Sequence, residues 1–329
     1  MRPELFEIPF IHVTLKSYGL MMVIGFIAAV SVIRRLSRNI TPDPQMITNV
    51  ALYSLIGGVV GARLFYIIHY YEHFNGNLLS VFAIWHGGLE LLGGVVLAIS
   101  IIFIYLLYHK LPVRHYLDIL AIGLMLALAF GRIGCFLNGC CYGKPTELPW
   151  GICFPYNSIA YLSQINSDLE RNRLEPQLKL PKGEYFGYID TNDNWHPKPF
   201  DELTEQQKLE VTKGRYRCRP VHPTQIYSSI AAAFLCLILY LFWRRSQKGG
   251  KVLAKPGSTF ALMLLLYGAF RFFIEFLRDD NPYELSFLTI SQIIGITMIV
   301  FGTALMIMFQ KMKQTVPVSK KKNTPKKSE

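Results

Sequence analysis

Charged residues are scarce in this chain of 329 residues: they make up 17% of it, whereas hydrophobic residues make up 51%. The apolar residues also lack the regular spacing of a soluble core. They gather in blocks of about 20, the length at which a helix spans a bilayer. Seven blocks lie at roughly 18–33, 47–69, 88–108, 116–137, 224–243, 257–277 and 287–309. The sequence therefore predicts an all-α polytopic membrane protein with about seven transmembrane helices.

Lysine and arginine are absent from two connections between these blocks, 70–83 and 279–286, although the net charge is +12. They gather in the alternate connections, at Arg34 to Arg38, Lys110 to Arg114, 244–255 and the tail from Lys311. The positive-inside rule places these basic segments in the cytoplasm. Seven spans then place the N-terminus outside and the C-terminus inside. The positive charge is thus explained by membrane topology, and no nucleic-acid partner is expected.

The N-terminal block lacks the basic region of a signal peptide, so we expect it to stay as the first span. One long polar stretch, 144–222, interrupts the apolar blocks and predicts a small extracytoplasmic head domain, with helices at about 158–173 and 201–213. The predicted domains are a membrane domain with spans 1–4 (1–143), the head domain (144–222), a membrane domain with spans 5–7 (223–310) and a basic cytoplasmic tail (311–329). We expect the tail to lie on anionic lipid.

Metal-binding patterns are also missing. The run from Asp190 to Asn194 resembles the start of a calcium loop, but Trp195 stands where such a loop needs glycine, so we favour a solvated turn. Four residues could bind zinc or act as a nucleophile: Cys135, Cys140, Cys141 and His222. Their spacing in the sequence, however, matches no known family of zinc sites. We predict neither metal nor cofactor. Small-residue packing or a disulfide is the favoured role of these cysteines, because disulfides are permitted at the outer face.

Basic residues inside the apolar blocks are few, and all of them are arginines: Arg63, Arg132, Arg271 and Arg278. An arginine at the centre of a bilayer costs about 2.5–3.5 kcal/mol on insertion scales, so such a residue needs a reason to be there. Arginine suits the bidentate capture of phosphate or carboxylate better than lysine does. Four glycines and Asn138 crowd the segment Gly131–Gly143 around Arg132. We interpret this segment as the mouth of a buried polar site in which Arg132 binds an anion.

The sixth block carries a second polar group, formed by Tyr267, Arg271, Glu275 and Arg278. Their spacing of four, four and three residues places them on one helix face. Two interpretations remain open: an anion site shared with Arg132, or a structural Arg271–Glu275 ion pair with Arg278 reaching the interface. Similarly, His86 is either a base or an interfacial residue, and Tyr18 and Tyr267 either contact substrate or belong to the aromatic belt. The patterns alone predict an outward-facing, arginine-lined cavity suited to phosphate.

Six motifs run in order over nearly the whole chain, and region 157–217 carries none of them. They are Tyr18-Gly-Leu-Met, Gly61-Ala-Arg63, Trp85-x-Gly-Gly with Gly93-Gly94, Gly131-Arg-Ile-Gly with Asn138-Gly139 and Gly143, His222-Pro-Thr-Gln-Ile-Tyr, and Tyr267-Gly-Ala-Phe-Arg271 with Glu275 and Arg278. In these motifs the chain resembles the prolipoprotein diacylglyceryl transferase family.

The resemblance implies an enzyme of the bacterial inner membrane. Such an enzyme moves a diacylglyceryl group from phosphatidylglycerol, a membrane lipid, to the lipobox cysteine of a preprolipoprotein, forming a thioether and releasing glycerol phosphate. The implied catalytic residues are Arg271, Tyr267, Glu275 and Tyr18, and the implied substrate-binding residues are Arg132, Asn138, Gly139, Gly143, Arg63 and Arg278. In this scheme Arg132 and Arg271 hold the phospholipid head group, and Glu275 orients an arginine.

The chain departs from the family pattern at four positions. Leu92 stands where many members have a histidine that is often proposed as a base, Cys135 where asparagine is common, Cys140 where an acidic residue is common, and Ser228 where glutamate is frequent. For the base, three hypotheses remain open: His86, a group on the substrate, or no protein base. Two alternatives to the function also remain, namely a paralogue with another acceptor and a non-catalytic binder or transporter of an anionic amphiphile. The retained Arg132, Tyr267, Arg271 and Glu275 favour the enzyme.

Overall fold

A computed structural model shows a mostly helical chain. Six of its described helices are long and apolar enough to cross a membrane: α1 (Ser17–Ser37), α2 (Gln45–His69), α4 (Val113–Asn138), α8 (Thr224–Gln247), α9 (Ser258–Ile274, extended to Leu277 by the turn η6) and α10 (Ile290–Lys311). A shorter apolar helix, α3 (Leu91–Tyr108), forms from the remaining predicted span. The chain is therefore a multi-pass membrane protein. The structure describes residues 4–8, 13–40, 43, 45–71, 88, 90–171, 173–190, 194–247, 255–281, 283–285 and 288–312.

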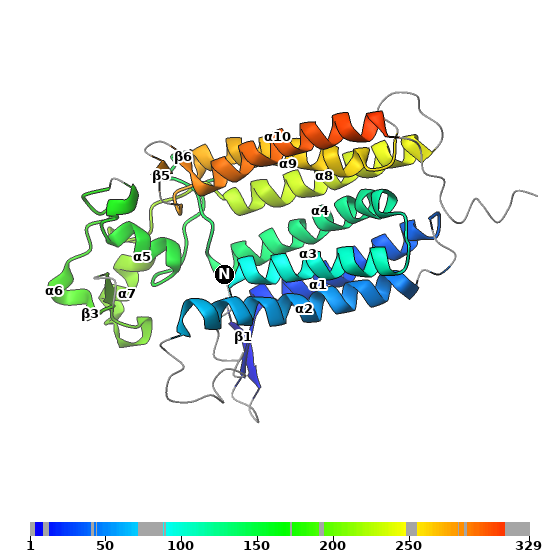
Figure 1. The fold of residues 1–329 in the computed structure, drawn as a ribbon. Coiled ribbons are helices and arrows are strands. Elements are labelled where there is room, and N and C mark those ends of the chain that lie inside the picture. The colour runs from blue at the N-terminus through cyan, green and yellow to red at the C-terminus, as the bar shows by residue number, and fades with distance from the viewer. Residues whose placement is uncertain are drawn as a thin grey trace, which may run out of the picture. The chain divides into compact units, whose positions relative to one another are not determined.

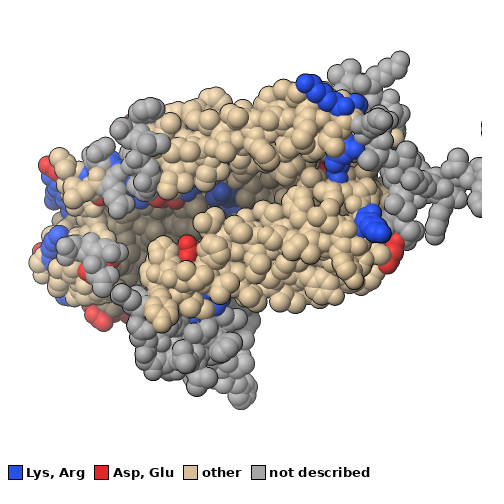
Figure 2. Space-filling model, in the orientation of Figure 1, with Lys and Arg blue, Asp and Glu red and all other residues tan. Residues whose placement is uncertain are grey.

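The outer faces of the long helices are apolar. Ile56 and Val60 on α2, and Ile230 and Phe234 on α8, are each more than half exposed. Charged side chains are scarce along the helices on the face that Figure 2 shows. Such broad apolar surface is unusual on a soluble monomer and is expected where lipid covers the helices.

The chain divides into two compact units, which are described separately. The first comprises Met1–Ile27, Leu124–Leu241 and Ala261–Ile307, and the second comprises Ala28–Gly123, Phe242–Phe260 and Met308–Glu329. The boundaries of the two units cut across helices.

In the second unit, glycines allow α2 and α3 to pack closely (Figure 1). A Cβ added to Gly61 would lie 2.5 Å from the carbonyl oxygen of Gly93, and one added to Gly93 would lie 2.5 Å from that of Gly61. Small residues let helix backbones approach in this way. Of the motif Trp85-x-Gly-Gly with Gly93-Gly94, the second glycine pair lies inside α3. Residues 85–87 of that segment lie outside the described residues.

Asp118 on α4 is a buried cap for α9 and not the interfacial residue that its place in the sequence suggests. Its carboxylate accepts hydrogen bonds from the backbone N–H groups of Gly257 (2.8 Å) and Phe260 (3.1 Å). The first N–H groups of a helix have no partner within the helix, so an oxygen acceptor stabilises them.

In the first unit, the polar stretch folds around its own apolar cluster, which includes Tyr142, Phe154, Tyr161, Tyr185, Trp195 and Val221. Its elements are α5 (Ile159–Ile165), η4 (Leu169–Arg171), α6 (Lys182–Tyr185), β3 (Phe186–Ile189), β4 (Trp195–Pro197), η5 (Phe200–Glu202) and α7 (Glu205–Thr212). The long helix predicted at 158–173 is wrong beyond Ile165. There the side chain of Asn166 bonds to the backbone N–H and carbonyl of Trp195 and ends the helix. Of the turn predicted from Asp190 to Asn194, residues 191–193 lie outside the described residues.

Three two-stranded antiparallel sheets, which the all-α prediction did not include, also belong to the first unit. They pair β1 (Glu4–Ile8) with β2 (Val13–Lys16), β3 with β4, and β5 (Tyr283–Leu285) with β6 (Leu288–Thr289). Strands of five residues or fewer are too short for alternation of polar and apolar residues to identify them. Close to the last pair, α9 and α10 run side by side (Figure 1), with Gly268 facing Gly295.

The Asp118 cap predicts a loss of stability on truncation. Asp118→Ala leaves two buried N–H groups of α9 without an acceptor, at a cost of about 1–3 kcal/mol each. We expect a lower thermal unfolding midpoint in detergent, and a smaller decrease for Asp118→Asn, which keeps one acceptor oxygen. Glu205→Ala, which removes a carboxylate with a 91% exposed side chain, is the control. Equal midpoints for wild type and Asp118→Ala would contradict the capping role.

Candidate active site

Three segments of the first unit cross just beyond the end of α4. The N–H of Gly143 donates to the carbonyl of His222 (3.0 Å), and the N–H of Lys144 donates to the carbonyl of Leu277 (2.8 Å). A Cβ on Gly143 would lie 2.6 Å from the Cβ of His222 and 2.7 Å from the carbonyl oxygen of Leu277. Only glycine fits this crossing, which joins the end of α4, the start of α8 and the end of α9.

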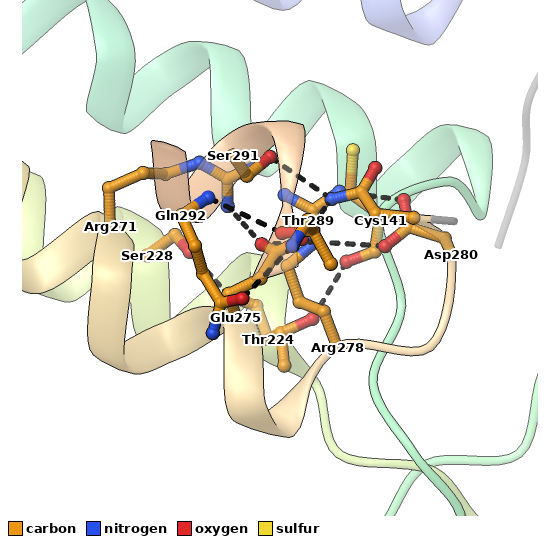
Figure 3. A network of polar contacts seen from close by, with 11 residues as sticks. Cys141, Thr224, Ser228, Arg271, Glu275, Arg278, Asp280, Thr289, Ser291 and Gln292 are labelled. Carbon is orange, nitrogen blue, oxygen red and sulfur yellow. Dashed lines mark hydrogen bonds and ion pairs between the residues drawn. The ribbon is translucent and has the colours of Figure 1, made fainter. Parts of the chain in front are cut away.

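Glu275 is the centre of a buried polar network at this crossing (Figure 3). Its carboxylate lies 3.0 Å from Nη1 of Arg271 and 3.8 Å from Nε of Arg278, and its side chain is 1% exposed. The other carboxylate oxygen accepts hydrogen bonds from the hydroxyl of Thr289 (3.0 Å) and from the amide of Asn281. Burying a carboxylate is costly unless it is paired and hydrogen-bonded in this way.

The two arginines have further partners. Arg271 donates a hydrogen bond to the hydroxyl of Ser291. Arg278 forms a bidentate ion pair with the carboxylate of Asp280, with N–O distances of 2.8 and 2.7 Å. Burial by itself would lower the pKa of Arg278, but the hydrogen bonds and charge of Asp280 outweigh burial and raise that pKa above its usual value. The guanidinium group of Arg278 therefore stays charged, and its bonds to Asp280 fix its position.

The predicted helix face through Tyr267, Arg271, Glu275 and Arg278 is correct only as far as the end of α9. The α-helix ends at Ile274, and a 3-10 turn covers Glu275–Leu277. Arg278 is extended and pairs with Gly143 in a β-bridge, which turns the chain away from the helix axis. Its side chain nevertheless returns to Glu275.

Arg132 on α4 differs from the other two arginines, because it makes no hydrogen bond or ion pair with the described residues. It is half-buried, and it interacts electrostatically with Tyr267, Cys141 and Arg278. Together with Arg271 and Arg278 it makes three cations. Glu275 and Asp280 supply two anions, so one positive charge remains uncompensated. A guanidinium without a protein partner in a cluster of this kind is suited to an anionic ligand.

Two tyrosines border Arg132. Tyr18, the second residue of α1, packs against Gly134, where an added Cβ would lie 3.1 Å from its ring. Its phenol interacts electrostatically with Cys135 and Arg132. Tyr267, one turn before Arg271 on α9, interacts with both Arg132 and Arg271. The first unit thus brings together Tyr18, Arg132, Tyr267, Arg271, Glu275 and Arg278.

Asn138 and Gly139 mark the exit from α4. Gly139 has a φ of +78°, a left-handed conformation that favours glycine. Both residues line a cleft of about 310 Å³ with the segment from Phe154 to Ile159. They shape the turn that leads into the crossing at Gly143.

The sequence analysis considered Cys135, Cys140 and Cys141 as possible metal ligands but did not predict that they lie together at this end of α4. The sulfur atoms of Cys135, Cys140 and Cys141 lie within 4.8 Å of one another. All six cysteines are free thiols, so the disulfide considered for them is not formed. Hydrogen bonds from Cys135 and Cys140 lower the pKa of Cys141, and the charges of Arg278 and Arg132 act in the same direction. The missed signal is Gly139, whose helix-ending role brings Cys140 back toward Cys135.

The remaining predicted residues lie elsewhere. Arg63 belongs to the second unit, where it donates to the carbonyl of Gly88 (2.9 Å) and lies over the ring of Tyr66. Leu92 is an exposed residue in the first turn of α3. Ser228 is buried and donates to the carbonyl of Thr224 within its own helix. His86 lies outside the described residues.

Comparison with known proteins identifies the relatives of the chain. A family model described as prolipoprotein diacylglyceryl transferase matches residues 3–308. A protein of Clostridium tetani named phosphatidylglycerol–prolipoprotein diacylglyceryl transferase is 29% identical over 302 residues, covering 92% of this chain and 95% of the relative. Proteins of the same name from Synechococcus elongatus (25% identical, covering 96% of this chain and 90% of the relative) and Xanthomonas oryzae (28% identical, covering 92% and 89%) are also similar.

The network around Glu275 predicts that removal of its charge destabilises the protein. Glu275→Gln keeps an acceptor oxygen for Thr289 but leaves Arg271 buried without its carboxylate. Breaking a buried pair in this way costs about 3–5 kcal/mol. We expect the thermal unfolding midpoint in detergent to fall well below that of Glu205→Gln, which alters an exposed pair with Lys208. Similar midpoints for the two variants would show that the network contributes little.

Proposed function

The chain belongs to the prolipoprotein diacylglyceryl transferase family, and we propose that its arginine cluster is where a diacylglyceryl group leaves phosphatidylglycerol for the lipobox cysteine of a prolipoprotein. The chain is an enzyme of lipoprotein maturation and a multi-pass membrane protein. Phosphatidylglycerol and prolipoproteins, which appear in the names of the relatives, are accordingly its proposed substrates.

The observation that carries this proposal is the guanidinium of Arg132, which has no hydrogen-bond or ion-pair partner among the described residues. The substrate lipid has one phosphodiester and therefore one negative charge. The cluster of Arg132, Arg271 and Arg278 has one positive charge beyond what Glu275 and Asp280 neutralise. A monoanionic phosphodiester matches this excess, and the planar guanidinium can bind two of its oxygens at once.

The proposed reaction is a displacement at carbon. The thiolate of the acceptor cysteine forms a C–S bond with the terminal glyceryl carbon of the diacylglyceryl group. The C–O bond to phosphate breaks, and its electron pair leaves on glycerol phosphate. The thiol proton passes to solvent. Arg132 and Arg271 stabilise the charge that develops on the leaving phosphate, which is the usual task of fixed cations in a site sheltered from water.

Other residues have proposed supporting roles. Glu275 positions Arg271 and Arg278, since it pairs with both. Tyr267 and Tyr18 position the lipid or the thiol, while Asn138, Gly139 and Gly143 shape the entrance. Arg63 was predicted to bind substrate. Its bond to the carbonyl of Gly88 supports a role in which it holds the segment before α3.

The proposed topology has seven spans in the inner membrane, with the N-terminus outside and the C-terminus in the cytoplasm. α3 has 18 residues, which correspond to about 27 Å of helix and are long enough to span with slight thinning of the bilayer. Residues 144–222 form the proposed extracytoplasmic head domain, and their separate apolar cluster supports this division from the membrane domains 1–143 and 223–310. The basic tail 311–329 is proposed to lie on cytoplasmic lipid.

The reaction can be tested directly with purified protein. Wild type in detergent is mixed with phosphatidylglycerol and a lipobox peptide, and the peptide is examined by mass spectrometry for diacylglyceryl on its cysteine. We expect transfer by wild type and a loss of about 100-fold or more for Arg132→Ala, the usual size of effect for a group that stabilises developing charge. Arg132→Lys should give an intermediate rate of transfer, because lysine keeps the positive charge but cannot bind two phosphate oxygens in a bidentate manner.

Arg244→Ala is the matched control, because Arg244 is an exposed arginine in the last turn of α8. It should leave transfer unchanged. If wild type gives no transfer but binds phosphatidylglycerol in an Arg132-dependent manner, the chain is a lipid binder and the proposed reaction is wrong.

A further inference from the structure

The cysteine group at the end of α4 is built by the helix cap itself. The N–H of Cys140 donates to the carbonyl of Cys135 (3.2 Å), and the N–H of Gly139 donates to the carbonyl of Phe136 (3.2 Å). With Gly139 left-handed, these two bonds form a Schellman motif. In this motif the side chains four residues before and one residue after the glycine come into contact. Those two positions are Cys135 and Cys140.

The backbone conformation of Cys141, the third cysteine, determines the direction of its side chain. Cys141 has a φ of +60°, an unusual value for a residue with a side chain. Two buried side chains of α8 hold the backbone in place: Gln225 donates to the carbonyl of Cys140 and Thr224 to that of Cys141, both at 2.7 Å. Strained backbone that is held by surrounding hydrogen bonds is typical of functional sites.

We propose that Cys135, Cys140 and Cys141 bind one zinc ion as thiolates, and that the fourth position of this ion binds the acceptor cysteine of the prolipoprotein. The first part stands on the cysteine geometry alone, and the second part rests on the proposed function. Three protein ligands with one open position are typical of catalytic zinc sites, as opposed to structural sites, which have four.

The spacing of the sulfur atoms fits this ion. Tetrahedral zinc with Zn–S bonds of about 2.3 Å places its sulfur ligands about 3.8 Å apart. The three sulfur atoms already lie within 4.8 Å of one another, so small side-chain rotations suffice. Thiolate ligands select soft or borderline metals such as zinc over magnesium or calcium. Among the residues that the structure describes, no other group of three His, Cys, Asp or Glu ligands gathers in this way.

Charge also favours the site. Three thiolates and one Zn²⁺ carry a net charge of −1, which is costly near the membrane unless it is balanced. Arg132 and Arg278 both interact electrostatically with Cys141, so their positive charges lie close to the proposed thiolates. The site therefore suits a thiolate-bound metal beside the arginines that receive the phosphate.

The zinc ion would activate the acceptor. A thiol that binds zinc loses its proton, which passes to solvent. The zinc-bound sulfur then forms the C–S bond as the C–O bond to phosphate breaks, and the electron pair leaves on glycerol phosphate beside Arg132. Electrons and atoms balance without any oxidant. This route supplies the thiolate without the histidine that Leu92 replaces.

The metal site is tested first by composition. Full-length protein purified in detergent without chelators is analysed for bound metals, and about one zinc ion per chain is expected. Cys135→Ser, Cys140→Ser and Cys141→Ser should each lower the zinc content several-fold, whereas Cys236→Ser, on α8 outside the group, should not. If purified wild type contains no zinc, or if cysteines of this group are joined by a disulfide, the proposed zinc site is wrong.

Cobalt provides a readout that does not depend on the variants. Wild type with Co²⁺ in place of zinc should show the sulfur-to-cobalt charge-transfer absorption of a tetrahedral thiolate site. A lipobox peptide should change this spectrum, and the same peptide with serine in place of its cysteine should not. If the cysteine peptide leaves the cobalt spectrum unchanged, the fourth coordination position of the metal does not bind the acceptor cysteine, and this part of the proposal is wrong.

The transfer assay separates this proposal from the proposed function. Transfer at full rate by protein shown to be free of metal overturns the zinc site and leaves the transferase intact. Bound zinc with the expected cobalt spectrum, but no transfer from phosphatidylglycerol, supports the metal site while the proposed function fails.

Discussion

The buried carboxylate of Glu275 is the interaction on which the rest of the site depends. It lies at the end of α9, where an uncompensated charge would be costly, and it is paired with Arg271 and Arg278. These pairs fix two guanidinium groups beside α4 and leave Arg132 without a carboxylate partner among the described residues. The same arrangement of charges therefore stabilises the network and leaves the guanidinium of Arg132 available for an anionic ligand. A further acidic side chain beside Arg132 would neutralise this charge and occupy the position of the ligand.

The network can form only because the backbone permits three segments to cross. Gly143 brings the exit from α4 against His222 and Leu277, and the resulting bonds set where α9 ends. The helix stops at Ile274, so Arg278 reaches Glu275 from an extended segment. Close packing at one glycine thus positions an ion pair several residues away in the same unit.

Much of this arrangement could be predicted from sequence, and the missing parts have a common cause. Blocks of apolar residues located all the long helices, because the length needed to cross a bilayer is a property of the local sequence. The spacing of Tyr267 and Arg271 likewise placed them on one face of α9. Within 144–222, the helix predicted at about 201–213 corresponds to η5 and α7. The helix predicted at 158–173 was too long because a distant partner ends it, as the bonds of Asn166 to Trp195 show. The burial of Asp118 likewise depends on a distant partner, since its carboxylate caps the start of another helix.

The departures at Cys135 and Cys140 appear independent in the sequence but are a single change in the structure. The two residues are five apart, yet the Schellman motif at Gly139 places them in contact. The family that the chain resembles commonly has an asparagine and an acidic residue at these positions. Here both are thiols, and the adjacent Cys141 adds a third. The helix cap at Gly139 therefore gathers the three thiols of the proposed zinc site at the end of the helix that carries Arg132.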